Sequence, residues 1–355
     1  MRPLGEHIAA LIRANGPLTI AEYMSLCLQH PEHGYYVKRD PLGAAGDFIT
    51  APEISQMFGE FIGLCLAQSW LDAGQPSPFT LAELGPGRGT LMADILRATR
   101  GVPGFIEAAD ILLIETSPAL RAVQAETLAA WSPRWSDSFE PSQNPLYLVA
   151  NEFFDALPIR QFQRTGNGWR ERVVGLHENR LNFGLTEPAP IAALAHRLAD
   201  TKDGDIVETS ARAEAVAQTI GAQITAHGGV ALIIDYGDWR SQGDTFQAIT
   251  EHEMVDPLAA PGKADLTAHV DFEALATAAE PAHSSLLTPQ GVFLERLGIT
   301  QRAQMLAANL DSDALETHIS AHRRLTHPEE MGSLFKVMAL FAEGASPPPG
   351  LFNDR

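Results

Sequence analysis

One short segment, Phe79-Thr-Leu-Ala-Glu-Leu-Gly-Pro-Gly-Arg-Gly-Thr90, limits the possible folds of this chain more than any other. Its apolar first half predicts a buried strand. Apolar residues recur at helical spacing after Thr90, which is a candidate N-cap. Between strand and helix, Gly85, Gly87 and Gly89 predict a turn whose backbone a ligand can approach closely. Such a unit presents free N–H groups at the strand's carboxyl end, where nucleotide-like ligands bind in open α/β sheets.

The residues around this turn discriminate between ligand classes. No Lys follows the glycines, which disfavours a phosphate-binding loop, and their spacing is not the G-x-G-x-x-G of dinucleotide sites. Glu83 at the strand end would repel a pyrophosphate but suits a cationic, zwitterionic ligand such as S-adenosylmethionine (SAM). Asp110-Ile-Leu-Leu-Ile-Glu115 predicts the next strand, and Glu115 at its end is a candidate for holding ribose hydroxyls. The alternative is a structural turn beside a solvated glutamate.

A second informative segment runs from Pro145 to Pro158. It predicts a buried strand whose end carries one amide, two carboxylates and two aromatic rings, namely Asn151, Glu152, Asp155, Phe153 and Phe154. Polar and aromatic side chains at a strand's carboxyl end are typical of a ligand cleft. The alternative is a helix capped by Asn151, with its acidic residues exposed to solvent.

Two other acidic residues are weaker candidates. Trp135-Ser-Asp137 fits a short third strand, so Asp137 either meets an adenine amino group or is a solvated loop residue. In Gly46-Asp-Phe-Ile-Thr-Ala-Pro-Glu53, Thr50 and Glu53 match a capping box that begins a helix to about Trp70. Capping chemistry does not require Asp47, which we interpret as belonging to either a structural loop or a site loop.

Composition limits the classes of partner. The 355 residues include 25 Lys and Arg against 44 Asp and Glu, a net charge of −19. Such a surface repels nucleic acid and anionic membranes and attracts a basic partner, although it also serves solubility alone. Cys27 and Cys65 stand in apolar helical segments, which predicts neither a disulfide framework nor a metal cluster and favours a reducing compartment. No segment resembles a membrane span or a targeting signal, so we expect a cytoplasmic, bacterial protein without membrane insertion.

The remaining patterns predict an α/β protein with additions. Residues 160–209 alternate in a β manner, and Gly228–Gly237 is another buried strand, which ends in Asp235 and Tyr236. We therefore divide the chain into five segments. These are a helical N-terminal region that contributes to the active site (1–78), a SAM-binding core (79–160), an inserted β-rich segment (161–209), the rest of the α/β core with C-terminal helices (210–345), and a mobile tail (346–355).

These segments together resemble the MidA-like family of SAM-dependent methyltransferases. The matching stretches follow the family's order and cover nearly the whole chain: residues 46–60, 83–89, 151–158, 234–237, 265–272 and 332–337. The glycine motif is shared by many methyltransferases. The stretches Asn-Glu-Phe-Phe-Asp-Ala-Leu-Pro and Thr-Ala-Pro-Glu are much more specific.

The resemblance implies a class I methyltransferase fold, which is a Rossmann-like sheet with a helical N-terminal region and an inserted β-rich or helical segment. It implies that SAM binds at Gly85, Gly87, Gly89 and Glu115. The other candidate SAM-binding residues are Glu83, Asp137 and Asn151. Because the family includes a mitochondrial complex I assembly factor that methylates an arginine, it also suggests a protein substrate with a basic, arginine-containing segment. A respiratory complex I-type subunit is one such substrate.

Methyl transfer from a sulfonium is an in-line displacement in which positioning supplies most of the acceleration. A guanidinium acceptor is cationic and delocalised, so carboxylates must orient it and take a proton. We expect Glu152 and Asp155 to do this, without a metal. Asp47 and Glu53 are the second candidates, and Asn151 is a further candidate catalytic residue. A small-molecule methyltransferase of the same fold and a non-catalytic SAM-binding assembly factor are the alternatives. The oligomeric state stays open.

Overall fold

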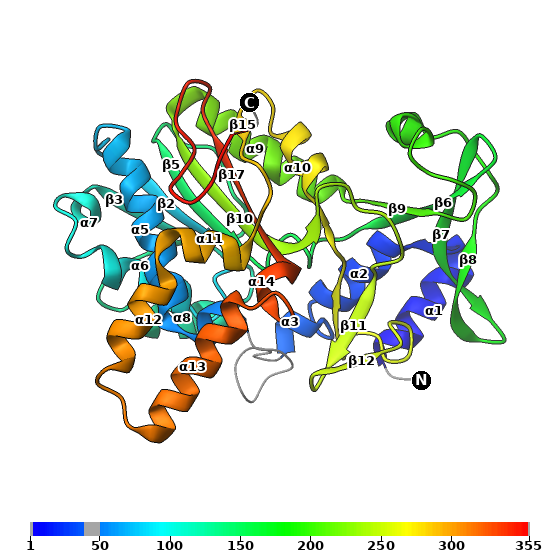
Figure 1. Ribbon diagram of the computed structural model, residues 1–355. Coiled ribbons are helices and arrows are strands. Elements are labelled where there is room, and N and C mark those ends of the chain that lie inside the picture. The colour runs from blue at the N-terminus through cyan, green and yellow to red at the C-terminus, as the bar shows by residue number, and fades with distance from the viewer. Residues whose placement is uncertain (1–2, 39–49, 354–355) are drawn as a thin grey trace.

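The computed structural model describes residues 3–38 and 50–353, and a nine-stranded sheet forms its centre (Figure 1). Along the sheet the order is β15-β17-β10-β5-β2-β3-β4, while β14 pairs with β10 and β16 with β17. The strands are β2 (Phe79–Leu84), β3 (Ala109–Ile114), β4 (Arg134–Ser136), β5 (Leu146–Asn151), β10 (Gly229–Asp238), β14 (Val270–Asp271), β15 (His283–Ser284), β16 (Thr288–Pro289) and β17 (Phe335–Phe341).

The strand directions define a doubly wound sheet. β4, β3, β2, β5 and β10 are parallel to their neighbours, whereas β17 is antiparallel to β10. The chain runs outward from β2 to β3 and β4, and then returns to the other side of β2 for β5 and β10. The strand order therefore reverses between β2 and β5, which is where open α/β sheets bind ligands. The predicted α/β fold with a Rossmann-like sheet is confirmed.

Helices cover both faces of this sheet because its strands are apolar on both sides. One face packs against α5 (Gln56–Asp72), α6 (Thr90–Thr99) and α11 (Gln290–Leu297), with Leu81 and Leu232 pointing to that side. The other face packs against α9 (Ala211–His227) and α10 (Phe272–Ala278), with Ala82 and Ile233 pointing there (Figure 1). This alternation is the period-two pattern of strands buried on both faces.

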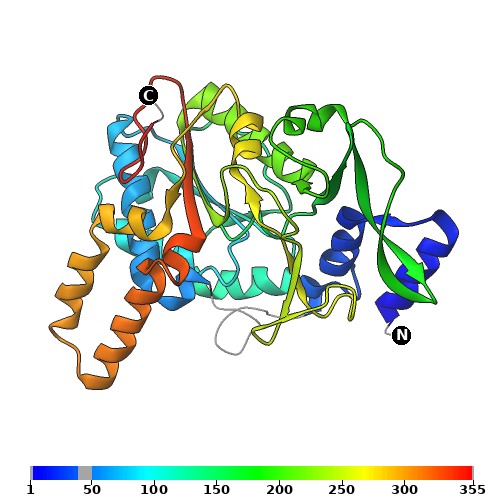
Figure 2. The same ribbon diagram turned by 45° about the vertical axis from the view of Figure 1, so that its right-hand side comes forward.

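A smaller unit lies beside the central sheet (Figure 2). Its five-stranded sheet contains β1 (Leu18–Thr19), β6 (Arg160–Thr165), β7 (Gly168–His177), β8 (Arg180–Leu185) and β9 (Ile206–Thr209). A three-stranded sheet adds β11 (Gln247–Thr250), β12 (Glu253–Val255) and β13 (Asp265–Thr267). The helices α1 (Pro3–Asn15) and α2 (Ile20–Gln29) share one apolar cluster with these strands. The N-terminal region thus packs with the inserted segment, since Leu18 on β1 pairs with Val174 on β7. The proposed segment boundaries stay a prediction.

The remaining helices are short or peripheral. They are α3 (Tyr35–Lys38), α4 (Ala51–Ile54), α7 (Phe105–Ala108), α8 (Pro118–Thr127), α12 (Ile299–Ala307), α13 (Ser312–Thr326) and α14 (Met331–Leu334), with a 3-10 helix at Ala192–Leu198. Within the described ranges, no helix has the length and apolar character needed to cross a bilayer.

Thr50 is the N-cap of α4, as predicted, but the predicted capping box and the predicted N-cap of α6 are wrong. The Thr50 side chain makes no cap hydrogen bond, and the N-cap of α6 is Gly89 with a φ of +83°. Instead the Thr90 hydroxyl donates to Glu53 Oε1 at 2.6 Å, so these two residues join α6 to α4. The helix predicted up to Trp70 is broken at Ser55, whose side chain caps α5.

The described part of the C-terminal segment, up to residue 353, packs against the core, and the mobility of the tail 346–355 stays a prediction. Leu351 is 3% exposed and belongs to the core beside α11. Asn353 forms a bridge with Ser285, and Leu286 N–H donates to the Phe352 carbonyl. Leu351 therefore attaches this proline-containing segment to the core.

The contact between α5 and α6 depends on two glycines, which gives a test of the fold. A Cβ at Gly63 would lie 2.9 Å from Ile95 Cα, and one at Gly59 would lie 2.5 Å from Asp94 Cβ. We expect Gly63→Val to lower the free energy of unfolding by ~1–3 kcal/mol, since the helices must separate. Leu64→Val changes a side chain that is 45% exposed and should alter stability by less than ~0.5 kcal/mol. Urea denaturation measures both, and a Gly63→Val protein as stable as wild type would contradict the packing.

Candidate active site at the strand ends

A cavity of about 650 Å³ opens at the carboxyl ends of β2, β3, β4 and β5. Its wall contains most of the predicted site residues: Glu53, Glu83, Gly85, Gly87, Glu115, Asp137, Asn151 and Glu152. Thr50 and Pro52 of the α4 segment also line it. Asp47 lies outside the described residues.

The glycine turn lines this cavity. Gly85 and Gly87 have φ values of +62° and +53°, a backbone region that residues other than glycine rarely adopt. A Cβ at Gly85 would lie 3.0 Å from the Phe153 ring. Gly89 stands behind the wall, where its left-handed backbone starts α6. The turn thus needs glycines for conformation at Gly89 and for both conformation and space at Gly85.

Glu83 is a buried acid without a complete set of partners. It is 3% exposed, and no described residue forms a hydrogen bond with its Oε2 atom. Burial raises the pKa of Glu83 to about 8. An uncompensated carboxyl that faces a cavity is suited to bind an ammonium or another cationic group.

Glu115 is held in place by a residue that the sequence analysis missed. Its Oε1 accepts from Ser117 N–H at 2.7 Å, and its Oε2 accepts from Gln124 Nε2 at 3.3 Å. The same Gln124 nitrogen donates to the Gly87 carbonyl at 2.7 Å, so one buried amide on α8 connects the turn to Glu115. A single glutamine in a helix gives no sequence signal of this role. Burial raises the pKa of Glu115.

Asp137 occupies the rim of the cavity. Its side chain is 80% exposed, and its Oδ1 accepts from Arg121 Nη2 at 2.7 Å. Arg121 also donates through Nε to the Glu115 carbonyl at 2.8 Å, which ties the ends of β3 and β4 together. Phe139 lines the cavity nearby and supplies an apolar surface.

The turn after β5 places Glu152 at the opposite wall. Glu152 has a left-handed backbone with a φ of +51°. Its Oε1 accepts from Asn151 Nδ2 at 2.9 Å and from Ala51 N–H at 3.3 Å. Burial, followed by the nearby Asp155, raises the pKa of Glu152 to about 7. The Oδ1 atom of Asn151 is buried and has no partner among the described residues.

Asp155 does not join Glu152 in the cavity wall. It is 6% exposed, and its Oδ2 accepts from the Tyr236 hydroxyl at 2.6 Å. The turn at Glu152 directs Asp155 behind the site, which corrects the expectation of direct contact with an acceptor. Tyr236 is another residue without an assigned role in the sequence analysis, although its segment 234–237 was singled out.

The charge of the cavity favours a cationic ligand. Five carboxyl side chains line it, from Glu53, Glu83, Glu115, Asp137 and Glu152, together with the two guanidinium groups of Arg88 and Arg212. In the part of the chain that the structure describes, no three histidine, cysteine or acidic side chains are arranged to hold a metal ion.

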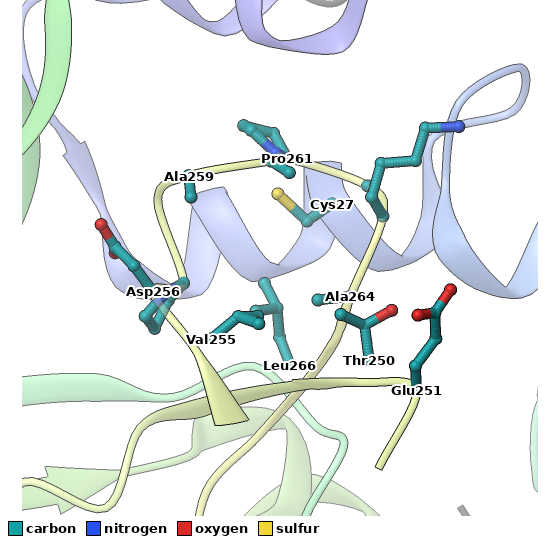
Figure 3. A pocket seen from close by; sticks show the side chains of 13 residues that line it. Cys27, Thr250, Glu251, Val255, Asp256, Ala259, Pro261, Ala264 and Leu266 are labelled. Carbon is teal, nitrogen blue, oxygen red and sulfur yellow. The ribbon is translucent and has the colours of Figure 1, made fainter. Parts of the chain in front are cut away.

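A second cavity of about 340 Å³ lies away from the strand ends, between α2 and the loop around residues 256–264 (Figure 3). The Cys27 side chain lies beneath the part of the loop that carries Ala259 and Pro261 (Figure 3). Burial raises the pKa of Cys27 to about 11, so it is a thiol at neutral pH and a poor nucleophile. Cys27 is therefore not an activated nucleophile in this cavity.

The raised pKa of Glu83 predicts how stability depends on pH in the ligand-free protein. Between pH 4.5 and about 8 the folded state retains the Glu83 proton and the unfolded state releases it. Stability is therefore lost as pH rises through this window, by up to ~1.4 kcal/mol per pH unit. We expect Glu83→Gln to flatten this dependence in urea denaturation between pH 5 and 8, whereas Glu107→Gln, at an exposed position on α7, should not. An identical slope for Glu83→Gln and wild type would contradict the assignment.

Comparison with known proteins places the chain in a family. Residues 61–290 match the model of a family described as "Putative S-adenosyl-L-methionine-dependent methyltransferase". A zebrafish (Danio rerio) protein named protein arginine methyltransferase NDUFAF7, mitochondrial, is 39% identical over 94% of this chain and 86% of its own length. The human protein of that name is 36% identical over 95% and 83%.

Solved structures agree with this relationship. A Burkholderia thailandensis protein described as a "likely methyl transferase" and crystallised with S-adenosyl-homocysteine superposes with a TM-score of 0.83 at 32% identity, covering 98% of this chain and 93% of its own. A native crystal structure from the same organism gives a TM-score of 0.80 at 31% identity, over 99% and 95% of the two chains.

The relatives also correct one prediction. A cytoplasmic, bacterial location is contradicted by the names of the zebrafish, bovine and human proteins, which are mitochondrial and eukaryotic. Two reduced cysteines and an acidic surface do not distinguish between reducing compartments, so composition was insufficient for this inference. The matches in sequence and structure do identify the family: the chain belongs to this family of SAM-dependent methyltransferases.

Proposed function

We propose that this methyltransferase transfers the methyl group of SAM to an arginine side chain of a protein. The observation that carries the proposal is Glu152, a half-buried carboxyl held at the wall of an acidic cavity. The names of the relatives support an arginine acceptor. Which protein presents that arginine stays a prediction, and the resemblance favours a respiratory complex I-type subunit.

The cavity offers a fitting partner for each part of SAM. Glu83 Oε2, which has no partner among the residues that the structure describes, would accept from the ammonium group, and the open backbone at Gly85 and Gly87 would lie against the ligand. Glu115, fixed by Ser117 and Gln124, would hold the ribose hydroxyls. Asp137 stands at the rim for the adenine amino group. SAM, when bound, supplies an electrophilic methyl group on a cationic sulfur.

Glu152 has the properties required to prepare a guanidinium for this reaction. A carboxylate pairs with a guanidinium through directed hydrogen bonds, and so fixes which nitrogen faces the methyl group. As the new N–C bond forms and the C–S bond breaks, that nitrogen must lose a proton. With a pKa of about 7, Glu152 is poised to accept this proton near neutral pH. Asn151 Nδ2 and Ala51 N–H hold Oε1 during these steps.

The acceptor is tested with purified protein, tritium-methyl SAM and a protein extract, followed by acid hydrolysis of the labelled proteins. We expect the label in methylated arginine. Glu152→Gln should lower transfer by at least ~100-fold, because the amide neither accepts a proton nor pairs with a cation. Its affinity for SAM in titration calorimetry should stay within about three-fold of wild type, since the proposed donor contacts lie at the ends of β2, β3 and β4. Label in a small molecule or in no product, or equal loss of SAM binding, would contradict the proposal.

The donor side is tested at Gly87. We expect Gly87→Val to abolish the binding of SAM and S-adenosylhomocysteine in calorimetry. A β-branched residue is strained at a φ of +53°, and the valine side chain would be added at the lining of the cavity. Gly101→Val is the matched control, since a Cβ there meets no atom within 4 Å. Retained binding in Gly87→Val would remove the glycine turn from the donor site.

A further inference from the structure

Asp235 is a buried acid whose position in the fold is unusual. It lies on β10, the strand between β5 and β17, and is fully buried. The β10 residues that precede it, from Val230 to Ile234, are all apolar. A carboxyl group in such surroundings is costly unless its oxygens are hydrogen bonded, so its partners indicate why it is present.

Those partners are almost all backbone groups of the turn that carries Glu152. The Oδ2 atom of Asp235 accepts from the N–H groups of Phe153, Phe154 and Asp155 at 3.2, 3.0 and 3.2 Å. Its Oδ1 atom accepts from Tyr236 N–H at 3.0 Å. Three consecutive N–H groups that converge on one oxygen form a concave anion-binding turn. The bonds match the ionised form of Asp235, whereas burial and the nearby Asp155 and Glu152 raise its pKa.

This arrangement determines the conformation at Glu152. The backbone of Glu152 adopts a φ of +51°, which costs free energy for any residue except glycine. The bond from Glu152 N–H to the Ile234 carbonyl at 2.9 Å fixes the strand side of the turn, and the three bonds to Asp235 fix the other side. Without Asp235, three buried N–H groups would lose their acceptor, and the turn would relax to find another.

We infer that Asp235 is a positioning residue for methyl transfer, which anchors the turn that aims the Glu152 carboxyl into the cavity. It touches neither donor nor acceptor, and acts through the backbone of residues 152–155. The inference rests on the proposed role of Glu152. Tyr236 secures the far end of the same turn through its bond to Asp155, so adjacent β10 residues hold the turn at two points.

The test compares Asp235→Asn and Asp235→Ala with Glu208→Gln. Glu208 is a matched control because it is also buried, at 5% exposure, and accepts from Gln161 and Thr245 in the smaller unit. Asparagine keeps one oxygen for the three N–H groups but places an amide against Tyr236 N–H, whereas alanine removes every acceptor. Rates are measured on the extract proteins that wild type labels with tritium-methyl SAM.

We expect kcat to fall roughly 100-fold in Asp235→Ala and less in Asp235→Asn, since an ångström of misplacement has effects of this size. The affinity for SAM should stay within about three-fold for both variants, and kcat in Glu208→Gln within about two-fold, because none of these residues contacts the donor site. Hydrogen exchange at residues 153–155 should accelerate in both Asp235 variants and not in Glu208→Gln. This exchange measurement reports on the turn even if Asp235→Ala folds poorly, because Asp235→Asn conserves volume.

A double mutant separates positioning from a general effect on the fold. If Asp235 acts through Glu152, Asp235→Asn should slow wild type but cause no further loss in Glu152→Gln. Equal slowing in both backgrounds, or exchange at residues 153–155 as slow as in wild type, would overturn the inference. If Glu152→Gln itself keeps the wild-type rate, the proposed function of Glu152 fails, while the exchange data still decide whether Asp235 anchors the turn.

Discussion

The alignment of parallel strands is the constraint on which the rest of this structure depends. Leu84 at the end of β2 pairs with Ile114 on β3 and with Ala150 on β5, so three strands end at the same level. The residues that follow are Gly85, Glu115 and, after Asn151, Glu152, which are far apart in sequence and share one cavity. Helices on both faces leave this edge as the open side of the sheet, which makes it the place for a ligand. The register therefore brings chemical groups together that no local pattern joins.

Burial of carboxyl groups at this edge has an energetic consequence. Glu83 and Glu152 have pKa values raised to about 8 and about 7, because the surrounding apolar strands penalise their charged forms. A globular protein gains no stability from such groups, and an uncompensated buried polar atom destabilises the fold. The oxygens of Glu83 and Asn151 that no described residue pairs are consistent with sites whose partners arrive with a ligand. Local violations of the rules of folding are expected where a protein binds or reacts.

Local sequence patterns predict the parts of this structure whose interactions are local, and they do not contain the interactions between distant residues. The strand, the glycine turn and the helix after it follow from neighbouring residues, and the structure has them within one residue of expectation at Phe79–Leu84 and Thr90. The pairing of Thr90 with Glu53 joins residues 37 positions apart, and that of Tyr236 with Asp155 joins residues 81 apart, so no window of sequence contains them. Asp155 was expected beside Glu152 because both follow one strand. The left-handed backbone at Glu152, which sequence did not indicate, turns Asp155 behind the wall.

The segment before the core completes the site through Glu152. Ala51 N–H donates to Glu152 Oε1 across 101 positions of sequence, and Glu53 two residues later accepts from Thr90 at the start of α6. A hydrogen bond to a carboxylate lowers its pKa and so opposes the effect of burial, which means that α4 adjusts the basicity of Glu152 as well as covering it. On the other side, Asp235 and the Ile234 carbonyl hold the backbone of the same turn. The side chain that we propose as proton acceptor is thus bonded to α4 while its backbone is bonded to β10. Its position depends on two elements that the chain builds more than 170 residues apart, and neither alone would place it.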